Sequence, residues 1–294
     1  MGARELALLA ALALMWAASF TFIKIAVATV PPATIVAGRL AVAAVLLWAY
    51  LALTGRRLPR PGRAWRLYGV LAVTGNTLPF LLIAWAETRV DSGLAAILIG
   101  TVPVITVLLA HRLSPDEPLG AHTWAGVALG LAALAVLAGP HALAGLGGTL
   151  LAQVALVGAA ASYALNGLLV RRIRADVVSA SAAVLVASAA LALPISLALD
   201  RPWQLAPSWA AVWAVLAQGA FSTALATIAF FHLVTVAGAA ATSFVNYLIP
   251  AVAVALGVVW LGERPGWPEL AALALILAGL ALVNRRRASR PPRT

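Results

Sequence analysis

The chain contains no cysteine, and charged residues make up only 10% of its 294 positions. The absence of cysteine excludes disulfides and thiolate metal ligands, and it leaves the redox compartment open. Soluble domains carry roughly a quarter charged residues, whereas here hydrophobic residues reach 63%. Composition therefore predicts a polytopic membrane protein with no room for a soluble domain.

Acidic groups are also missing from the middle of the long apolar runs. We expect all nine at helix ends or in loops: Glu5, Glu87, Asp91, Asp116, Glu117, Asp176, Asp200, Glu263 and Glu269. Proton coupling through a mid-membrane carboxylate is therefore not predicted, and His232 would be the alternative. An intramembrane enzyme would need a buried base or a metal cluster, which four scattered histidines do not supply. No Gly-x-x-x-x-Gly-Lys-Ser/Thr motif for ATP is present.

Ten apolar segments are long enough to cross the ~30 Å hydrocarbon layer as helices. They lack the strict alternation of a membrane barrel, so we predict an all-α fold of ten transmembrane helices. The segments lie near 5–28, 32–53, 66–86, 91–112, 119–138, 148–170, 177–199, 208–233, 240–261 and 267–284.

The second half repeats the first at a spacing of 147 residues, half of the 294. Five crossings per half put the second half into the membrane upside down, and such inverted repeats surround a central site with two access routes. We expect one domain over 1–294, made of a first repeat at 1–140 and a second at 147–287. The recurring positions are Trp16 with Tyr163, Ser19 with Asn166, Lys24 with Arg171, and Pro103 with Pro250.

The net charge of +11 is distributed unevenly between the two sides of the predicted bundle. Fifteen of the 20 lysines and arginines fall in the two termini and in alternate loops, which predicts cytoplasmic termini in the inner membrane. The basic C-terminal run is expected to contact anionic lipid headgroups rather than nucleic acid. The first segment could pass for a signal peptide, but its length and its internal repeat partner predict a retained helix.

Two prolines interrupt the fourth and ninth segments near the bilayer centre. Pro103 lies twelve residues into its segment, roughly 18 Å along a helix, and Pro250 lies at the matching depth. A proline inside a helix frees a carbonyl and bends the helix, so we predict that both residues act in gating. A static packing kink is the alternative.

Polar and aromatic residues cluster at the same depth and predict a substrate-binding wall suited to a planar or amphipathic solute. Trp16 and Ser19 share one helix face, as do Tyr163 and Asn166, and a polar stripe from Thr242 to Pro250 is expected on the ninth helix. Hydrogen bonding between helices without solute contact is the alternative. The predicted substrate-binding residues are Trp16, Ser19, Asn76, Pro79, Tyr163, Asn166, Ser243, Asn246 and Tyr247.

For four charged residues near segment ends we predict structural roles. Lys24 and Arg39 are expected to snorkel toward the outer headgroups, with attraction of a substrate carboxylate as the alternative. Glu117 and Glu263 precede the fifth helix of each half and are expected to cap those helices.

The pattern Trp16-x-x-Ser19-x-x-x-x-Lys24, the mid-segment prolines and the sequence Gly262-Glu263-Arg264-Pro265 resemble the EamA-type drug/metabolite transporter superfamily. Within it, the chain is most similar to YddG-type aromatic amino acid exporters. The resemblance implies five-plus-five inverted symmetry and a cavity lined by the first four helices of each half. It also implies that the fifth helices pack as supports.

The sequence thus predicts an alternating-access exporter of amino acids, aromatic or neutral, or of related small metabolites, acting as a monomer without cofactor or metal. Its expected partners are the solute and membrane lipids. A multidrug or cation exporter of the same superfamily is the alternative. A nucleotide-sugar carrier would call for several basic groups at mid-depth, and a receptor would leave the inverted repeat unexplained.

Overall fold

The computed structural model describes residues 2–113, 121–138 and 148–285, and within these ranges the regular structure is entirely helical. The first repeat contains α1 (Ala3–Ala26), α2 (Pro32–Leu53), α3 (Ala64–Ala72), η1 (Val73–Thr77), α4 (Leu78–Glu87), α5 (Ser92–Ile99), α6 (Val102–Leu113) and α7 (Ala121–Ala138). The second contains α8 (Gly148–Leu169), η3 (Val170–Arg172), α9 (Val177–Leu199), η4 (Pro202–Gln204), α10 (Trp209–Ala217), η5 (Gln218–Leu225), α11 (Ala226–Thr242), α12 (Val245–Leu261) and α13 (Trp267–Arg285).

These elements combine into ten apolar spans. Seven are long enough to cross a membrane by length and composition, and the three shorter ones are Ala121–Leu137, Val245–Leu261 and Trp267–Leu282. Every segment predicted from the sequence is helical, which confirms the all-α polytopic fold with five spans in each half.

Two spans contain π-helical turns at related positions. In the first repeat η1 (Val73–Thr77) separates α3 from α4, and in the second η5 (Gln218–Leu225) separates α10 from α11. Adding 147 to 73–77 gives 220–224, which lies inside η5. Because π turns are rare and cluster at functional sites, their recurrence supports the repeat independently of residue identity.

The boundary between the eighth and ninth spans differs from the prediction. The eighth span was expected to end near 233, but it continues to Gly238, where φ 81 and ψ 160 break the helix. Of the polar stripe expected on the ninth helix, Thr242 and Ser243 therefore lie between this break and the start of α12 at Val245, with Ser243 in the turn, whereas Asn246, Tyr247 and Pro250 lie on α12. The π turns of η5 contribute to the discrepancy, because a wider turn spends more residues on the same rise.

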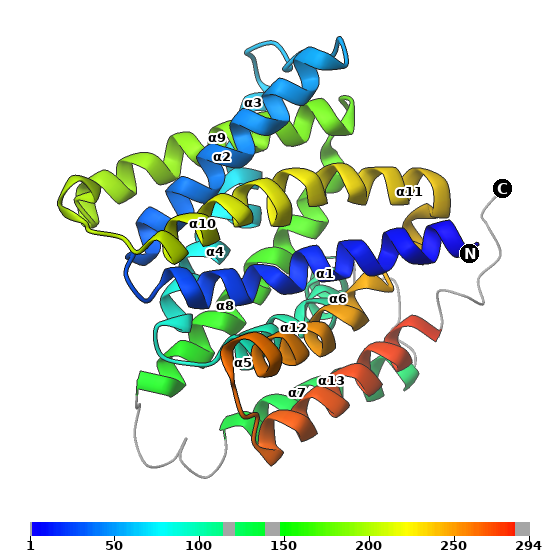
Figure 1. Ribbon diagram of the computed structural model, residues 1–294. Helices are drawn as coiled ribbons and strands as arrows, with labels where there is room; N and C mark the ends of the chain where they lie inside the picture. The colour runs from blue at the N-terminus through cyan, green and yellow to red at the C-terminus, as the bar shows by residue number, and fades with distance from the viewer. Residues whose placement is uncertain (1, 114–120, 139–147, 286–294) are drawn as a thin grey trace, which may run out of the picture.

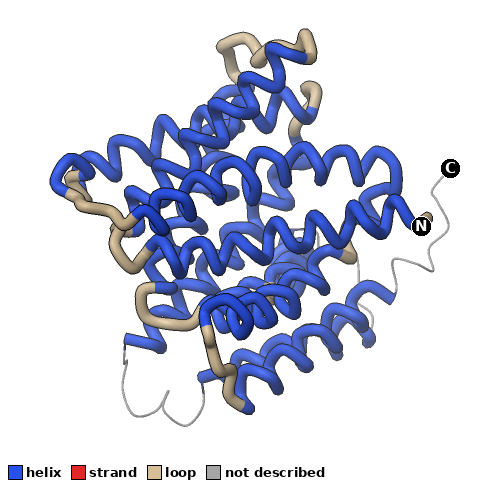
Figure 2. The backbone as a smooth tube through the Cα atoms, viewed as in Figure 1, coloured by secondary structure: helices blue, strands red, loops and turns tan. Residues whose placement is uncertain are grey.

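The helices form one bundle, in which α1 begins and α13 ends on the same side, called here the terminal end (Figure 1). The α1–α2 and α4–α5 connections lie at the other side, called the opposite end. Helices α7 and α13 pack against each other along one edge, apart from most of the bundle (Figure 2). This agrees with the supporting role that the resemblance implied for the fifth helices.

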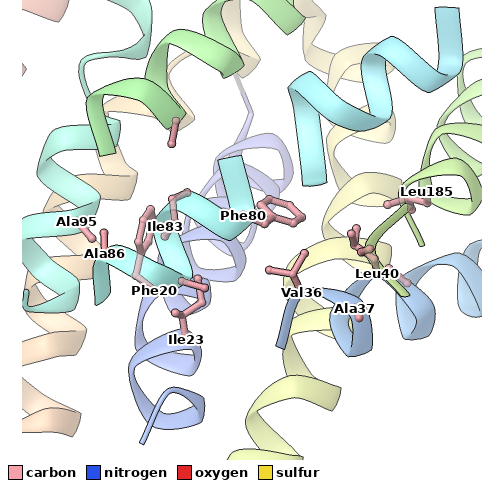
Figure 3. Close-up of a cluster of buried hydrophobic side chains, with 14 of the residues drawn as sticks. Phe20, Ile23, Val36, Ala37, Leu40, Phe80, Ile83, Ala86, Ala95 and Leu185 are labelled. Carbon is pink, nitrogen blue, oxygen red and sulfur yellow. The ribbon is translucent and has the colours of Figure 1, made fainter. Parts of the chain in front are cut away.

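The main apolar core lies where α1, α2, α4, α8 and α9 meet. Figure 3 shows Phe20 and Ile83 between α1 and α4, with Phe80 of α4 extending toward α2. Alanines dominate the closest contacts; Ala17, Ala43 and Ala159 are completely buried. Small side chains let helices approach closely, which matters in lipid because apolar residues gain little by leaving it for one another.

Candidate solute-binding cavity

A cavity of about 410 Å³ lies at the centre of the bundle. It is bordered by α1, α2, η1, α4, α5, α6, α8, η5, α11 and α12, and among the described residues α7, α9 and α13 contribute nothing to its wall. The lining residues are Trp16, Ser19, Phe20, Ile23, Arg39, Gly75, Asn76, Phe80, Ile83, Ile99, Gly100, Val102, Pro103, Tyr163, Asn166, Ser222, Thr223, Thr227, Asn246, Ile249 and Pro250.

Sixteen of these 21 residues form eight pairs spaced by 147 positions. Both repeats therefore build the wall from the same positions, although the side chains often differ in chemistry. The pairs are Trp16 with Tyr163, Ser19 with Asn166, Gly75 with Ser222, Asn76 with Thr223, Phe80 with Thr227, Ile99 with Asn246, Val102 with Ile249, and Pro103 with Pro250.

The five lining residues without a lining partner all belong to the first repeat. In chain order they are Phe20, Ile23, Arg39, Ile83 and Gly100. Along α1 and α4 the unpaired residues follow the paired ones toward the opposite end, so the cavity extends further toward that end than toward the terminal end. The expectation that the first four helices of each half line the cavity holds except for α9, whose repeat partner α2 contributes Arg39 alone.

Aromatic rings stand on both repeats' sides of the cavity. Trp16 packs against Phe230 of α11 with ring centroids 5.6 Å apart, and Tyr163 meets Phe80 edge-on at 6.5 Å. Tilted and edge-on packing of this kind is favourable beyond the area it buries. The aromatic rings on the cavity wall are therefore fixed in place by their packing against other rings.

The π turn η1 carries polar groups to the boundary between the repeats. Asn76 Nδ2 donates to Ser188 Oγ of α9 at 3.0 Å, and Thr74 Oγ1 donates to Asn166 Oδ1 of α8 at 3.2 Å. Both amides thus bridge the repeats, as the alternative interpretation proposed, and both also border the cavity. Contact with a solute and hydrogen bonding between helices are compatible here.

Arg39 does not snorkel to the headgroups. Its side chain is only 5% exposed, and its Nε donates to Thr223 Oγ1 of η5 at 2.8 Å. The guanidinium carbon lies 3.7 Å from the centre of the Phe80 ring, a cation–π arrangement. Arg39 is directed inward because α2 turns this face toward η5 and not toward lipid.

A close approach of α2 and η5 makes this placement possible. A Cβ at Gly219 would lie 2.6 Å from Val42 Cβ and 2.8 Å from the Arg39 carbonyl oxygen, so only glycine fits without movement. On η5, Thr223 Oγ1 donates to the Gln218 carbonyl at 2.9 Å, and Gln218 Nε2 donates to the Ser19 carbonyl of α1 at 3.0 Å. This network fixes the acceptor that holds Arg39.

Lys24 and Glu87 form a second polar group near the opposite end, in which Lys24 is partly exposed and Glu87 is buried. Lys24 Nζ donates to the backbone carbonyls of Glu87 and Val90 at 3.0 and 2.6 Å. Glu87 stands at the end of α4 as expected, but it is fully buried, and its carboxyl oxygens have no hydrogen-bond partner among the described residues. The sequence did not predict this burial because a helix end is usually exposed to headgroups or water.

Glu263 caps a helix, but not the one expected. Its carboxylate accepts hydrogen bonds from the backbone N–H groups of Ser92 and Gly93 at 2.7 and 3.0 Å, so it caps α5 in the first repeat rather than α13. A negative group is favourable at a helix N-terminus. The expectation for Glu117 lies outside the described residues.

Three predicted binding residues do not border the cavity. Pro79 is buried at the start of α4, inside the helical span that continues from η1, and Ser243 lies in the turn before α12. The Tyr247 hydroxyl donates to the Leu280 carbonyl of α13, so this ring points to the supporting pair of helices. The other six, Trp16, Ser19, Asn76, Tyr163, Asn166 and Asn246, all line the cavity.

Both predicted gating prolines line the cavity, but their helices respond differently. The fourth span breaks into α5 and α6, with Pro103 as the second residue of α6. The ninth span continues through Pro250 as the single helix α12. Gating by either residue stays a prediction.

Thirteen lining residues were not predicted, and the repeat could have revealed two of them. Thr223 lies 147 positions after the predicted Asn76, and Ile99 lies 147 positions before the predicted Asn246. Arg39 carried no such signal, because the related position is Val186. Its role depends on a contact between distant parts of the chain.

The EamA-like transporter family model matches residues 4–139 and again residues 150–285. The chain belongs to this family. Both matches coincide with the two halves found from the 147-residue spacing, so the EamA repeat and the structural repeat are the same unit. As an EamA-like protein it is an integral multi-pass membrane transporter that handles small solutes.

Similar proteins include two transporters of nearly the same length. A protein of Streptantibioticus cattleyicolor named a probable terminal-alkyne amino-acid exporter is 29% identical over 280 residues, which cover 94% of this chain and 91% of that protein. YedA, an uncharacterized inner membrane transporter of Escherichia coli K12, is 30% identical over 284 residues, covering 93% and 88%. A solved crystal structure superimposes with a TM-score of 0.67 at 21% identity over 99% of this chain and 100% of that one, a likeness of fold alone.

Proposed function

We propose that this protein exports amino acids, aromatic or otherwise neutral, or closely related small metabolites from the cytoplasm. One observation carries the proposal: the central cavity, whose wall draws eight pairs of residues from equivalent positions of the two repeats. A chamber built jointly by two repeats is the arrangement that alternating access requires, because each repeat can close one side of it. The relative named as a probable amino-acid exporter supports the solute class.

The size and chemistry of the cavity suit such a solute. A volume of about 410 Å³ falls in the usual range for small-molecule sites, and the wall contains both aromatic rings and amide and hydroxyl groups. A cation exporter is disfavoured because the described part of the wall carries a buried arginine and no acidic side chain. A nucleotide sugar would need several cations, and this wall offers one.

The proposed mechanism is rocking of two oppositely oriented repeats around the cavity. Each repeat has five spans, and this odd number reverses the second relative to the first in the membrane. The proline-interrupted fourth and ninth spans both reach the cavity and are the proposed moving walls. Residues 1–294 act as one domain, made of repeats 1–140 and 147–287, and a monomer suffices because the chain supplies both halves of the wall.

We propose that the protein lies in the inner membrane with both termini in the cytoplasm. Fifteen of the 20 lysines and arginines belong to the terminal side, and short cytoplasmic loops carry such an excess. The terminal end defined above would then face the cytoplasm, and the Lys24–Glu87 group would lie near the outer surface.

Counterflow in proteoliposomes tests the function. Vesicles containing purified protein are preloaded with unlabelled phenylalanine, tryptophan or leucine and diluted into the same labelled amino acid at trace concentration. Transient accumulation of label, absent from protein-free vesicles, is the expected result. Flux of a labelled organic cation, with no counterflow of any amino acid, would reject the proposed solute class.

A further inference from the structure

Among the described residues on the cavity wall, Arg39 alone carries a charge. The equivalent position in the second repeat is Val186, so no symmetric group balances or duplicates this cation. A charged side chain inside a membrane protein is costly unless it performs a task there. The function of Arg39 therefore depends on which hydrogen-bond donors of its guanidinium group are not already used by the protein.

Only part of the guanidinium group is engaged by the protein. Its Nε donates to Thr223 Oγ1 at 2.8 Å, and its flat face lies on Phe80 at 3.7 Å. Within residues 2–113, 121–138 and 148–285 the four N–H bonds of its two terminal nitrogens have no hydrogen-bond acceptor. The Arg39 side chain is thus fixed in position, while its two terminal nitrogens can still donate hydrogen bonds to a solute in the cavity.

No carboxylate of the described chain forms an ion pair with Arg39. Described carboxylates that form ion pairs elsewhere include Asp91, which pairs with Lys24, and Asp176, which pairs with Arg56. Glu87, the fully buried carboxylate at the end of α4, forms no salt bridge with Arg39 within 4.0 Å. A buried cation is favourable only when an anion or several hydrogen bonds compensate for its lost hydration.

We infer that Arg39 binds the carboxylate of the exported solute. A carboxylate offers two coplanar oxygens at the spacing of the guanidinium fork, and such pairs are stronger and more directional than neutral hydrogen bonds. This inference rests on the proposed function and narrows it to solutes that combine a carboxylate with an apolar or aromatic part. Amines without a carboxylate are excluded, since their charge is the same as that of Arg39.

The surroundings of Arg39 separate the two ends of such a solute. Phe20, Ile23 and Ile83 form an apolar wall on the first-repeat side, where an aromatic or branched side chain can lie. Ser19, Ser222 and Asn76 supply hydroxyl and amide oxygens that can accept hydrogen bonds from an ammonium group. A neutral amino acid therefore matches both the charge and the polarity of the wall.

A purely structural role makes a different prediction. If Arg39 served only to link α2 to η5 through Thr223, its loss would lower the amount of folded protein and the rate for every solute alike. It would not alter the preference between two solutes that differ only in the carboxylate. The preference ratio is therefore the informative measurement, because it does not depend on how much protein is active.

The experiment compares inhibition of labelled phenylalanine counterflow by unlabelled phenylalanine, which has the carboxylate, and by phenylalaninamide, in which a neutral carboxamide replaces it. Wild-type protein should prefer the acid by at least about tenfold, the effect of one charge-assisted hydrogen-bonded pair.

Arg39→Gln can keep a hydrogen bond to Thr223 but loses the charge, and its preference ratio should fall to about one. Arg39→Lys keeps the charge without the fork and should give an intermediate ratio. Arg89→Gln, which removes an exposed arginine at the same end of the bundle, should preserve the wild-type ratio.

A second measurement separates this inference from the proposed function. Purified wild-type protein should be stabilised against heat by phenylpropionate and not by phenylethylamine, and Arg39→Gln should lose this stabilisation. Absence of amino acid counterflow together with intact, Arg39-dependent stabilisation would reject amino acid export and uphold the carboxylate site. An acid preference that survives in folded Arg39→Gln, or stabilisation by the amine, would overturn the inference.

Discussion

The two repeats place equivalent residues around the same chamber, yet they endow it with different chemistry. In the first repeat Ile99, Gly75 and Phe80 border the cavity, and in the second the same positions are Asn246, Ser222 and Thr227. The first repeat also supplies the cation Arg39, where the second has Val186. Backbone geometry therefore follows the symmetry that the proposed alternating access requires, while the side chains depart from it in the way that recognition of an asymmetric solute would need.

The largest expected effect concerns the close contact between α2 and Gly219 of η5, because only the second repeat has a glycine at this position. Gly219 corresponds to Ala72 of the first repeat, and it meets the backbone of α2 so closely that a methyl group would clash. Gly219→Ala should destabilise the protein by about 1–3 kcal/mol, as expected for overpacking. Thermal unfolding in detergent, followed by tryptophan fluorescence, measures the change.

Gly69→Ala is the matched control for this prediction. Gly69 lies in α3, and a Cβ there would have open space, so alanine should stabilise the helix by about 0.5–1 kcal/mol. Equal responses of the two glycines would show that α2 and η5 are not in close contact.

The second effect tests whether the polar wall belongs to the second repeat alone. Asn246→Leu removes an amide from the cavity and should lower amino acid counterflow by about tenfold while the protein still folds. Ile99→Leu changes the equivalent position of the first repeat between two apolar side chains and should leave counterflow within about twofold. Unchanged counterflow by folded Asn246→Leu would remove the ninth span from the binding wall.

The third effect compares the two prolines. Pro250 lies inside the continuous helix α12 and leaves the Asn246 carbonyl without its usual helical partner, so Pro250→Ala should stabilise the protein by about 1 kcal/mol and slow counterflow. Pro103 is the second residue of α6, where no helical hydrogen bond is missing, and Pro103→Ala should leave thermal stability nearly unchanged.

Thermal unfolding and initial counterflow rates of the two variants test this comparison. If both substitutions stabilise the protein equally, the break between α5 and α6 does not relieve the cost of the proline in the fourth span. If Pro250→Ala transports at the wild-type rate, bending of α12 is static packing.

The smallest effect is a dependence on pH that arises at the N-cap of α9 in the second repeat, where the first repeat has no titrating group at the equivalent position. The Ser179 backbone N–H and hydroxyl, together with Arg56, hold the pKa of Asp176 below its ordinary value, although partial burial opposes them. Because the folded-state pKa is lowered, this stabilisation is present above the unfolded-state pKa of about 4 and is lost as the pH falls through the folded-state value.

Asp176→Asn should therefore flatten the fall in melting temperature on acidification at the low end of the pH range. The equivalent residue is Thr29, whose hydroxyl lies 3.2 Å from Ser208 Oγ and does not titrate in this range. Thr29→Ala should leave the pH profile parallel to that of the wild type. A profile unchanged in Asp176→Asn would assign the acid sensitivity to other carboxylates.

Much of the cavity was predictable because periodicity and repetition are properties of the sequence itself. Trp16, Tyr163, Asn76 and Pro250 were found from mid-span depth and from the 147-residue spacing, and all four line the cavity. The errors arose where local geometry departs from a regular α-helix. The break at Gly238 and the turn before Val245 separate Thr242 and Ser243 from α12, and no composition signal marks the π turn of η5 earlier in the same span.

The amino-acid sequence by itself determined the helical spans, their division into two related halves and the depth of most cavity residues, because apolar length and repetition act locally along the chain. The tertiary structure alone decided that Arg39 turns inward to Thr223, that Glu87 is buried and that Glu263 caps a helix of the other repeat. Each of these outcomes joins residues more than a hundred positions apart or depends on which helix covers a side chain. The energy of a charged group is set by such neighbours, so its role follows from the assembled bundle.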